Sequence, residues 1–249
     1  MGVQSSVLRN TGPSLRPDRR HAGFAALALL AAAGPGMAAE AIYQGDIGGS
    51  AVTMVIDLRN PIVRGTYYYD RHRTPIRLRP AIWHGARDGA LHPRVPGLDE
   101  VDTGGLPSAR LRFHEVPGSH LDEVAGTWTD YRSGRALPIR LRKVAWLGND
   151  VNRPEGSWPL LQAASTRRFY FEVPVEGGNA VTGVRVMDKA SGELAQQIEL
   201  STPVCTAGID TVQVGLEQGR VQLHVGADAP CRRVLFEWNA ARGRFEPAI

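Results

Sequence analysis

The chain has 249 residues, 43% of them hydrophobic, and a formal net charge of +4. Residues 1–40 carry a net charge of +2, with four arginines within the first twenty residues, residues 41–147 carry +4 and residues 148–249 carry −2. This even distribution argues against nucleic acid as a partner, which requires a concentrated basic patch. About 210 residues beyond the N-terminal segment suffice for one large β domain or two small ones.

The first 39 residues have the pattern of a signal peptide. Arginines at 9, 16, 19 and 20 precede ten apolar residues at 24–33. That apolar stretch has the length of a signal-peptide core and about half the length of a membrane-spanning helix. We expect cleavage between positions 38 and 41, a periplasmic or secreted location in a Gram-negative bacterium, and no membrane span. A buried helix of a cytosolic domain is the alternative.

Residues 41–147 have the pattern of an all-β domain, either an antiparallel barrel or a sandwich. Runs of β-forming residues alternate with turn residues and helix signals are nearly absent. The predicted strands are 51–58, 63–69, 75–82, 106–115, 124–128 and 137–147. The acidic, Gly- and Pro-rich stretch at 93–105 is predicted to be a surface loop.

This domain contains a duplicated hairpin. Residues 63–67 (VRGTY) lead to 75–79 (PIRLR), and residues 124–128 (VAGTW) lead to 138–142 (PIRLR). In each return strand the alternation places the apolar side chains on one face and the arginines on the other. A period of two indicates a half-buried strand with one face in water.

Residues 148–160 are rich in Pro, Gly and Asn and are predicted to be a linker. A smaller antiparallel β region follows at 161–249, with a strand at 169–175 and hairpins predicted at 181–200, 211–225 and 234–245. Cys205 and Cys231 are the two cysteines, and an even pair in an exported protein predicts one disulfide. Such a bond would stabilise the fold by roughly 3 kcal/mol. Two buried free thiols are the alternative.

No catalytic motif is recognisable, so we predict no catalytic residues. Loop carboxylates could still form the acid pair of a glycan-active enzyme, with Asp99, Glu100 and Asp102 or Asp122 and Glu123 as the candidates.

We predict no metal site and no cofactor. His114, Glu115 and His120 are close in sequence, but surface histidines near a strand end are the simpler interpretation, and neither cysteine has the neighbours of a zinc ligand.

The best candidates for a functional role suit recognition of an acidic surface. Arginine pairs carboxylates through two parallel hydrogen bonds, and tyrosine supplies rigid contact area. If the two arginine-bearing strands, 75–79 and 138–142, share a surface, they form an arginine stripe beside the tyrosines at 67–69. The predicted binding residues are Tyr68, Tyr69, Arg71, Arg73, Arg77, Arg79, Arg140 and Arg142. An ordinary solvated sheet face is the alternative interpretation.

Two segments carry a resemblance to known families. Residues 43–49, 63–69 and 76–78 follow the pattern Y-x-G-x-I-G…G-x-Y-Y-Y and resemble a β domain of exported bacterial proteins of uncharacterised function. The C-terminal hairpin at 235–245 resembles the end of periplasmic proteins with an FG-GAP/VCBS-like region, some of which are immunity proteins against lysozyme-like effectors. The resemblance covers most of the mature chain, and its motifs are structural in kind.

The calcium loop of that second family is degenerate in this sequence. Only Gly219 matches, and Val214, Leu216, Gln218 and Gln222 occupy the positions of the oxygen ligands. The resemblance therefore implies no bound calcium.

The sequence favours a non-enzymatic periplasmic binding protein, with inhibition of a cell-wall hydrolase as one form of that function. The expected partner is an envelope protein or an anionic glycan. A glycan-active enzyme and a lipocalin-like carrier of a small ligand are the alternatives. A large apolar cavity within residues 41–147 would favour the carrier, and a filled core would oppose it.

Overall fold

The computed structural model describes residues 40–58, 63–81, 97–102, 104–115, 117, 121–147, 158–175, 180–227 and 231–248. The predicted signal peptide therefore lies outside the described residues. The described part of the chain is nearly all β, with a single 3₁₀ turn. This confirms the predicted fold class.

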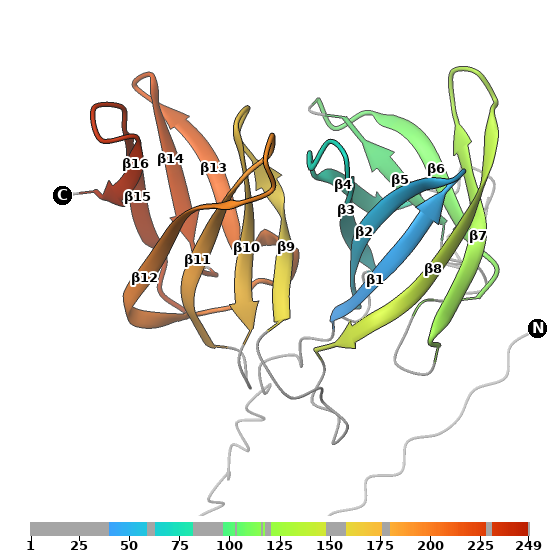
Figure 1. Cartoon of the computed structure of the whole chain (residues 1–249), viewed down its shortest axis with the longest axis horizontal. Coiled ribbons are helices and arrows are strands. Elements are labelled where there is room, and N and C mark those ends of the chain that lie inside the picture. The colour runs from blue at the N-terminus through green and yellow to red at the C-terminus, as the bar shows by residue number, and fades with distance from the viewer. Residues whose placement is uncertain are drawn as a thin grey trace, which may run out of the picture. The chain divides into compact units, whose positions relative to one another are not determined.

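The first eight strands form a closed antiparallel barrel in which neighbours in sequence are neighbours in space (Figure 1). Pairing of β1 with β8 closes it. The strands are β1 (Glu40–Ile47), β2 (Ser50–Asp57), β3 (Arg64–Tyr69), β4 (Ile76–Pro80), β5 (Gly97–Val101), β6 (Pro107–Phe113), β7 (Glu123–Asp130) and β8 (Ala136–Trp146). Closure pairs every strand on both sides and removes the exposed edges that invite aggregation.

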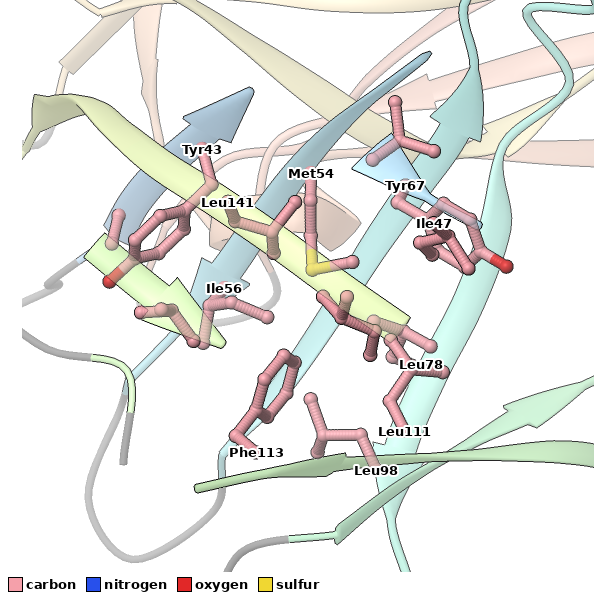
Figure 2. Packing of buried hydrophobic residues seen from close by; sticks show 14 residues of the cluster. Tyr43, Ile47, Met54, Ile56, Tyr67, Leu78, Leu98, Leu111, Phe113 and Leu141 are labelled. Carbon is pink, nitrogen blue, oxygen red and sulfur yellow. The ribbon is translucent and has the colours of Figure 1, made fainter. Parts of the chain in front are cut away.

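Alternation along each strand fills the barrel with side chains. Tyr43, Met54, Phe113 and Leu141 come from four different strands and project into the interior beside other apolar residues (Figure 2). All four are buried, with exposed fractions between 0% and 4%. A filled interior is the arrangement that opposes a lipocalin-like carrier.

The duplicated hairpin forms β3–β4 and β7–β8. The glycine of each copy faces a neighbouring strand at close range, since a Cβ on Gly65 would lie 2.6 Å from the Val55 carbonyl oxygen and one on Gly126 would lie 2.4 Å from that of Arg112. Only glycine fits at that distance. The glycine shared by the two copies is therefore required by the packing of the barrel wall.

The two copies differ in register by two residues. Gly65 lies opposite Leu78, whereas Gly126 lies opposite Ile139, which is the counterpart of Ile76 in the first copy. A shift of two preserves which side chains face inward, because the side-chain period of a strand is two. The second copy has two more residues between its glycine and its PIRLR segment than the first copy has. The shift in register accommodates them without exposing the core.

Eight further strands form two four-stranded antiparallel sheets, ordered β12-β11-β10-β9 and β13-β14-β15-β16 (Figure 1). They are β9 (Trp158–Ser165), β10 (Phe169–Val175), β11 (Ala180–Asp188), β12 (Leu194–Cys205), β13 (Val212–Glu217), β14 (Arg220–Val225), β15 (Val234–Asn239) and β16 (Arg244–Pro247), with the 3₁₀ turn η1 (Gly208–Asp210) before β13. An aromatic cluster of Phe169, Phe171, Trp238 and Phe245 packs between the sheets.

Two glutamine side chains join these sheets where no strand pairing does. Gln196 of β12 donates to the Phe245 carbonyl oxygen (2.8 Å) and accepts from the Phe245 N–H (2.9 Å) on β16. Gln162 of β9, fully buried, accepts from the Val212 N–H (3.0 Å) and donates to the Leu160 carbonyl oxygen (3.0 Å). Gln196 thus connects the edge strands β12 and β16, and Gln162 connects the edge strands β9 and β13.

The predicted disulfide has its partners in place. The sulfur atoms of Cys205 and Cys231 lie 2.16 Å apart, and their Cα atoms 5.8 Å apart. The bond ties the end of β12 to the segment before β15.

Three strands lie where no strand was predicted. Strand β1 was not recognised, β5 lies within the predicted loop at 93–105, and β9 begins within the predicted linker at 148–160. The loop prediction was wrong because Asp99 and Glu100, which are poor strand formers, are satisfied by side-chain partners elsewhere in the barrel.

Replacing Gln162 with leucine should lower the free energy of unfolding by about 1–3 kcal/mol, because the buried Val212 N–H loses its acceptor. Urea unfolding followed by fluorescence measures the change. Gln197→Leu, at an exposed position on β12, is the control and should change the free energy by less than about 0.5 kcal/mol. Equal effects of the two substitutions would contradict the role given to Gln162.

Candidate functional site

The predicted segment 68–73 spans the end of β3 and the following turn, and its side chains point in different directions. Tyr69 points into the barrel, where its ring packs edge-on against Tyr67 with centroids 5.5 Å apart. Tyr68 points outward, and its ring meets Tyr170 of β10 at 5.5 Å. Tyr68 therefore serves packing between the barrel and the second β region.

Arg71 and Arg73 also separate. Arg73 has a positive φ of 49° and donates to the carbonyl oxygens of Lys189 (3.3 Å) and Ala190 (3.5 Å) in the β11–β12 turn. Arg71 is exposed, and its Nε donates to Nε2 of His72 at 2.9 Å. Arg73 thus anchors the turn that presents Arg71 and His72.

Arg71, His72 and Tyr69 line a hollow at one end of the barrel. The hollow has a volume of about 260 Å³ and lies where the β1–β2, β3–β4 and β7–β8 turns meet. Ile47 and Leu137 give it apolar surface, Arg71 and Arg135 supply its cationic side chains, and Tyr69 and His72 also line it. Gly48 and Ser50 complete the lining.

Sequence reasoning identified Tyr69 and Arg71 and missed Arg135. The repeat contained a usable signal, because His72 and Arg135 each stand three residues before the proline of their copy, Pro75 and Pro138. Both turns of the duplicated hairpin contribute to the hollow.

Among the described residues that line the hollow, none carries a carboxylate. The nearby acids have other partners: Asp46 accepts from the Gly49 N–H (2.9 Å) and Asp70 from the Thr53 hydroxyl (3.2 Å). Burial raises the pKa of Tyr69, so its hydroxyl stays protonated at neutral pH. The hollow is therefore cationic over an apolar floor.

Arg77 has a structural partner. Its Nη1 lies 2.6 Å from Asp210 Oδ1, and Arg64 Nη1 lies 2.5 Å from Asp210 Oδ2. Arg64 also contacts the fully buried Asp57 through Nε at 2.9 Å. Asp210, in the turn η1, thus links the barrel to the second β region through two arginines.

The four repeat arginines do not form one stripe. Strands β4 and β8 lie four positions apart in a closed barrel of eight, so Arg79 and the β8 pair face in opposite directions. Arg140 lies opposite Asp46 on β1, and Arg142 lies opposite Glu123 on β7. These carboxylates offset the charge of the β8 face.

Two of the acids considered for glycan hydrolysis, Asp99 and Glu100, lie on opposite faces of β5. Asp99 points outward, where Arg110 binds both its oxygens (2.8 and 3.2 Å) and the Tyr131 hydroxyl donates at 2.7 Å. Glu100 points inward and accepts hydrogen bonds from Tyr67 and Trp128. Neighbours on a strand point to opposite sides, so these two carboxylates cannot flank one sugar.

The buried Glu100 is a feature that sequence reasoning placed on the surface. It is 7% exposed, and burial raises its pKa, while the hydrogen bonds from Tyr67, Trp128 and Ser108 oppose that rise. It accepts a hydrogen bond from Tyr67, and the Tyr67 ring packs on Tyr69, which lines the hollow.

No cluster of three potential metal-ligating side chains occurs in the part of the chain that the structure describes. His114 and Glu115 are exposed after β6, and His120 lies outside the described residues. No helix among the described residues is both long and apolar enough to cross a bilayer.

Comparison of the chain with protein-family models, curated proteins and solved structures found no match.

Arg77→Gln should lower the free energy of unfolding by about 1–2 kcal/mol, because Asp210 loses one of two charged hydrogen-bond donors. Arg79→Gln, at an exposed position on the same strand, should change it by less than about 0.5 kcal/mol. Thermal and urea unfolding of both variants measure the difference. A neutral Arg77→Gln would show that the Asp210 contact does not stabilise the protein.

Glu100→Gln should stabilise the protein relative to wild type increasingly as the pH rises. The folded pKa of Glu100 lies above its unfolded value. Its contribution to stability is therefore complete below the unfolded pKa and is lost as the pH rises through the folded pKa. Glutamine keeps an acceptor for Tyr67 and Trp128 and does not ionise.

The free energies of unfolding of wild type and Glu100→Gln, measured between pH 4 and pH 8, test this expectation. Glu123→Gln reports the effect of removing an exposed carboxylate. A difference between Glu100→Gln and wild type that stays constant with pH, or falls, would refute the assignment.

Proposed function

We propose that this protein is a non-enzymatic binding protein of the bacterial envelope that recognises an acidic protein partner through the barrel end. The observation that carries the proposal is the hollow with Arg71 and Arg135 at its rim and no carboxylate among its described lining residues. In the described part of the chain neither guanidinium has an ion-pair partner, so both are available to a ligand. The export pattern of the first 39 residues supports the compartment.

Inhibition of a cell-wall hydrolase is the form of this function that we favour. Such enzymes carry two carboxylates at the bottom of a cleft. The exposed Arg71 and Arg135 have the charge to pair with carboxylates of such an enzyme. Electrostatic complementarity of this kind raises association rates and selects the partner.

The interior of the barrel and the positions of its acidic side chains favour a binding protein over a small-ligand carrier or a glycan-active enzyme. The interior is filled by side chains, which leaves little room for a carried ligand (Figure 2). Asp99 and Glu100 are committed to partners on opposite faces of β5. The barrel end combines two arginines that have no ion-pair partner among the described residues with a concave, partly apolar surface.

The test measures hydrolysis of peptidoglycan by purified muramidases with and without the full chain, and capture of partners from a periplasmic extract at moderate salt. Arg71→Glu combined with Arg135→Glu should weaken inhibition or capture at least tenfold, since each tenfold step costs about 1.4 kcal/mol. Arg132→Glu is the matched control, because it lies in the same turn as Arg135 but does not line the hollow.

Retention of every partner by the double variant would refute the role of the barrel end. Absence of both inhibition and specific capture by the wild-type chain would refute a protein partner. Capture of an anionic glycan alone would replace the protein partner with a carbohydrate.

A further inference from the structure

The hollow at the barrel end has the features of a site for one small chemical group. Its volume of about 260 Å³ falls below the range of about 300–1,000 Å³ that is typical of pockets for drug-sized ligands. Such a space accommodates the end of a chain or one side chain. A sugar polymer or a lipid tail would need a longer groove.

The lining divides into two parts that need different ligand chemistry. Ile47 is 1% exposed, and it forms an apolar floor with Leu137 and the ring of Tyr69. Arg71 and Arg135 enter from two different turns and supply guanidinium groups at the rim. A ligand that uses both parts has an apolar body and an anionic head.

The anionic head is best matched by a carboxylate. Guanidinium groups pair carboxylates and phosphates through two parallel hydrogen bonds. A carboxylate on a short alkyl stem supplies both parts, because its head pairs with guanidinium groups and its stem can pack on the apolar floor. A cationic or neutral head would leave the two guanidinium groups unpaired.

The site is held in shape before any ligand enters. Arg71 is oriented by its hydrogen bond to His72, and the turn that carries both is fixed by Arg73 on the β11–β12 turn. On the opposite side, the Gly48 N–H donates to the Pro138 carbonyl oxygen (2.8 Å), which ties the β1–β2 turn to β8 beside Leu137. Preorganisation of this kind reduces the entropic cost of binding.

We infer that this hollow binds a carboxylate carried on a short apolar stem, either the C-terminal residue or an acidic side chain of the partner. This inference rests on the proposed function, because it names the group of the acidic partner that the barrel end receives. It assigns Arg71 and Arg135 to the carboxylate and Ile47, Leu137 and Tyr69 to the stem.

The experiment is a titration of the ¹⁵N-labelled full chain with butyrate, followed by NMR shifts of backbone N–H groups. Butyrate should produce saturable shifts at Gly48, Ser50, Tyr69 and Arg135. Butyramide, which lacks the charge, and inorganic phosphate, which lacks the stem, should each bind at least fivefold more weakly. Equal binding of butyramide or of phosphate would overturn the inference, as would butyrate shifts confined to other residues.

Variants test the assignment of the two arginines. Arg71→Gln and Arg135→Gln should each weaken butyrate binding at least fivefold, and Arg132→Gln should leave it unchanged. Backbone N–H spectra of each variant confirm that the barrel is folded. Unchanged butyrate binding in both cavity variants would refute the assignment.

Two peptides distinguish the sources of the carboxylate. One ends in leucine with a free C-terminus and is compared with its C-terminal amide, and the other has an internal glutamate and blocked ends. Loss of binding on amidation identifies a chain end, binding of the blocked glutamate peptide identifies a side chain, and failure of both peptides overturns the claim for a protein group.

The butyrate titration and the test of the proposed function have outcomes that can be distinguished. Butyrate binding at the hollow without any captured partner would refute the protein partner and keep the site. Capture that depends on Arg71 and Arg135 without butyrate binding would keep the barrel end as an interface and refute the carboxylate site.

Discussion

Closure of the barrel by pairing of β1 with β8 is the constraint on which the remaining structure depends. Once the sheet is closed, alternate side chains of every strand must share one interior, and in this protein they fill it (Figure 2). The barrel can therefore interact with other molecules only through its outer wall or its ends. Part of the wall is already used, because Tyr68, Arg64 and Arg77 contact the second β region. The β8 wall is balanced in charge by carboxylates on the neighbouring strands.

The arginines of the repeat show how topology changes the meaning of a sequence pattern. The two PIRLR segments are identical in sequence, yet Arg77 forms an ion pair with Asp210 while Arg140 faces Asp46 across β8 and β1. The neighbouring strand, and not the motif, decides what each arginine does. The parts of the repeat that come together are its turns, where His72 and Arg135 line one hollow.

The sequence was sufficient to predict the all-β class, the hairpins and the cysteine pair, because strand alternation and turn residues are local signals. It could not predict strand order, so it could not show that β4 and β8 lie on opposite sides of the barrel. Strand β5 was missed for a related reason. Asp99 and Glu100 disfavour a strand by propensity, and the partners that make them acceptable, Arg110 and Tyr67, lie on other strands, 11 and 33 residues away. Tertiary contacts override weak local preferences in such cases.

The second β region holds in place the β3–β4 turn of the candidate site. The β3–β4 turn carries Arg71 and His72, and an isolated turn of this length would sample many conformations. Arg73 hydrogen-bonds to the β11–β12 turn, and Tyr68 packs on Tyr170, so both sides of the turn are held by the second region. The Asp210 ion pairs hold the adjacent strands β3 and β4 in the same way. A binding group is most effective when the scaffold fixes its position before the partner arrives. The second region therefore contributes to recognition by restricting the turn, even though none of its described residues lines the hollow.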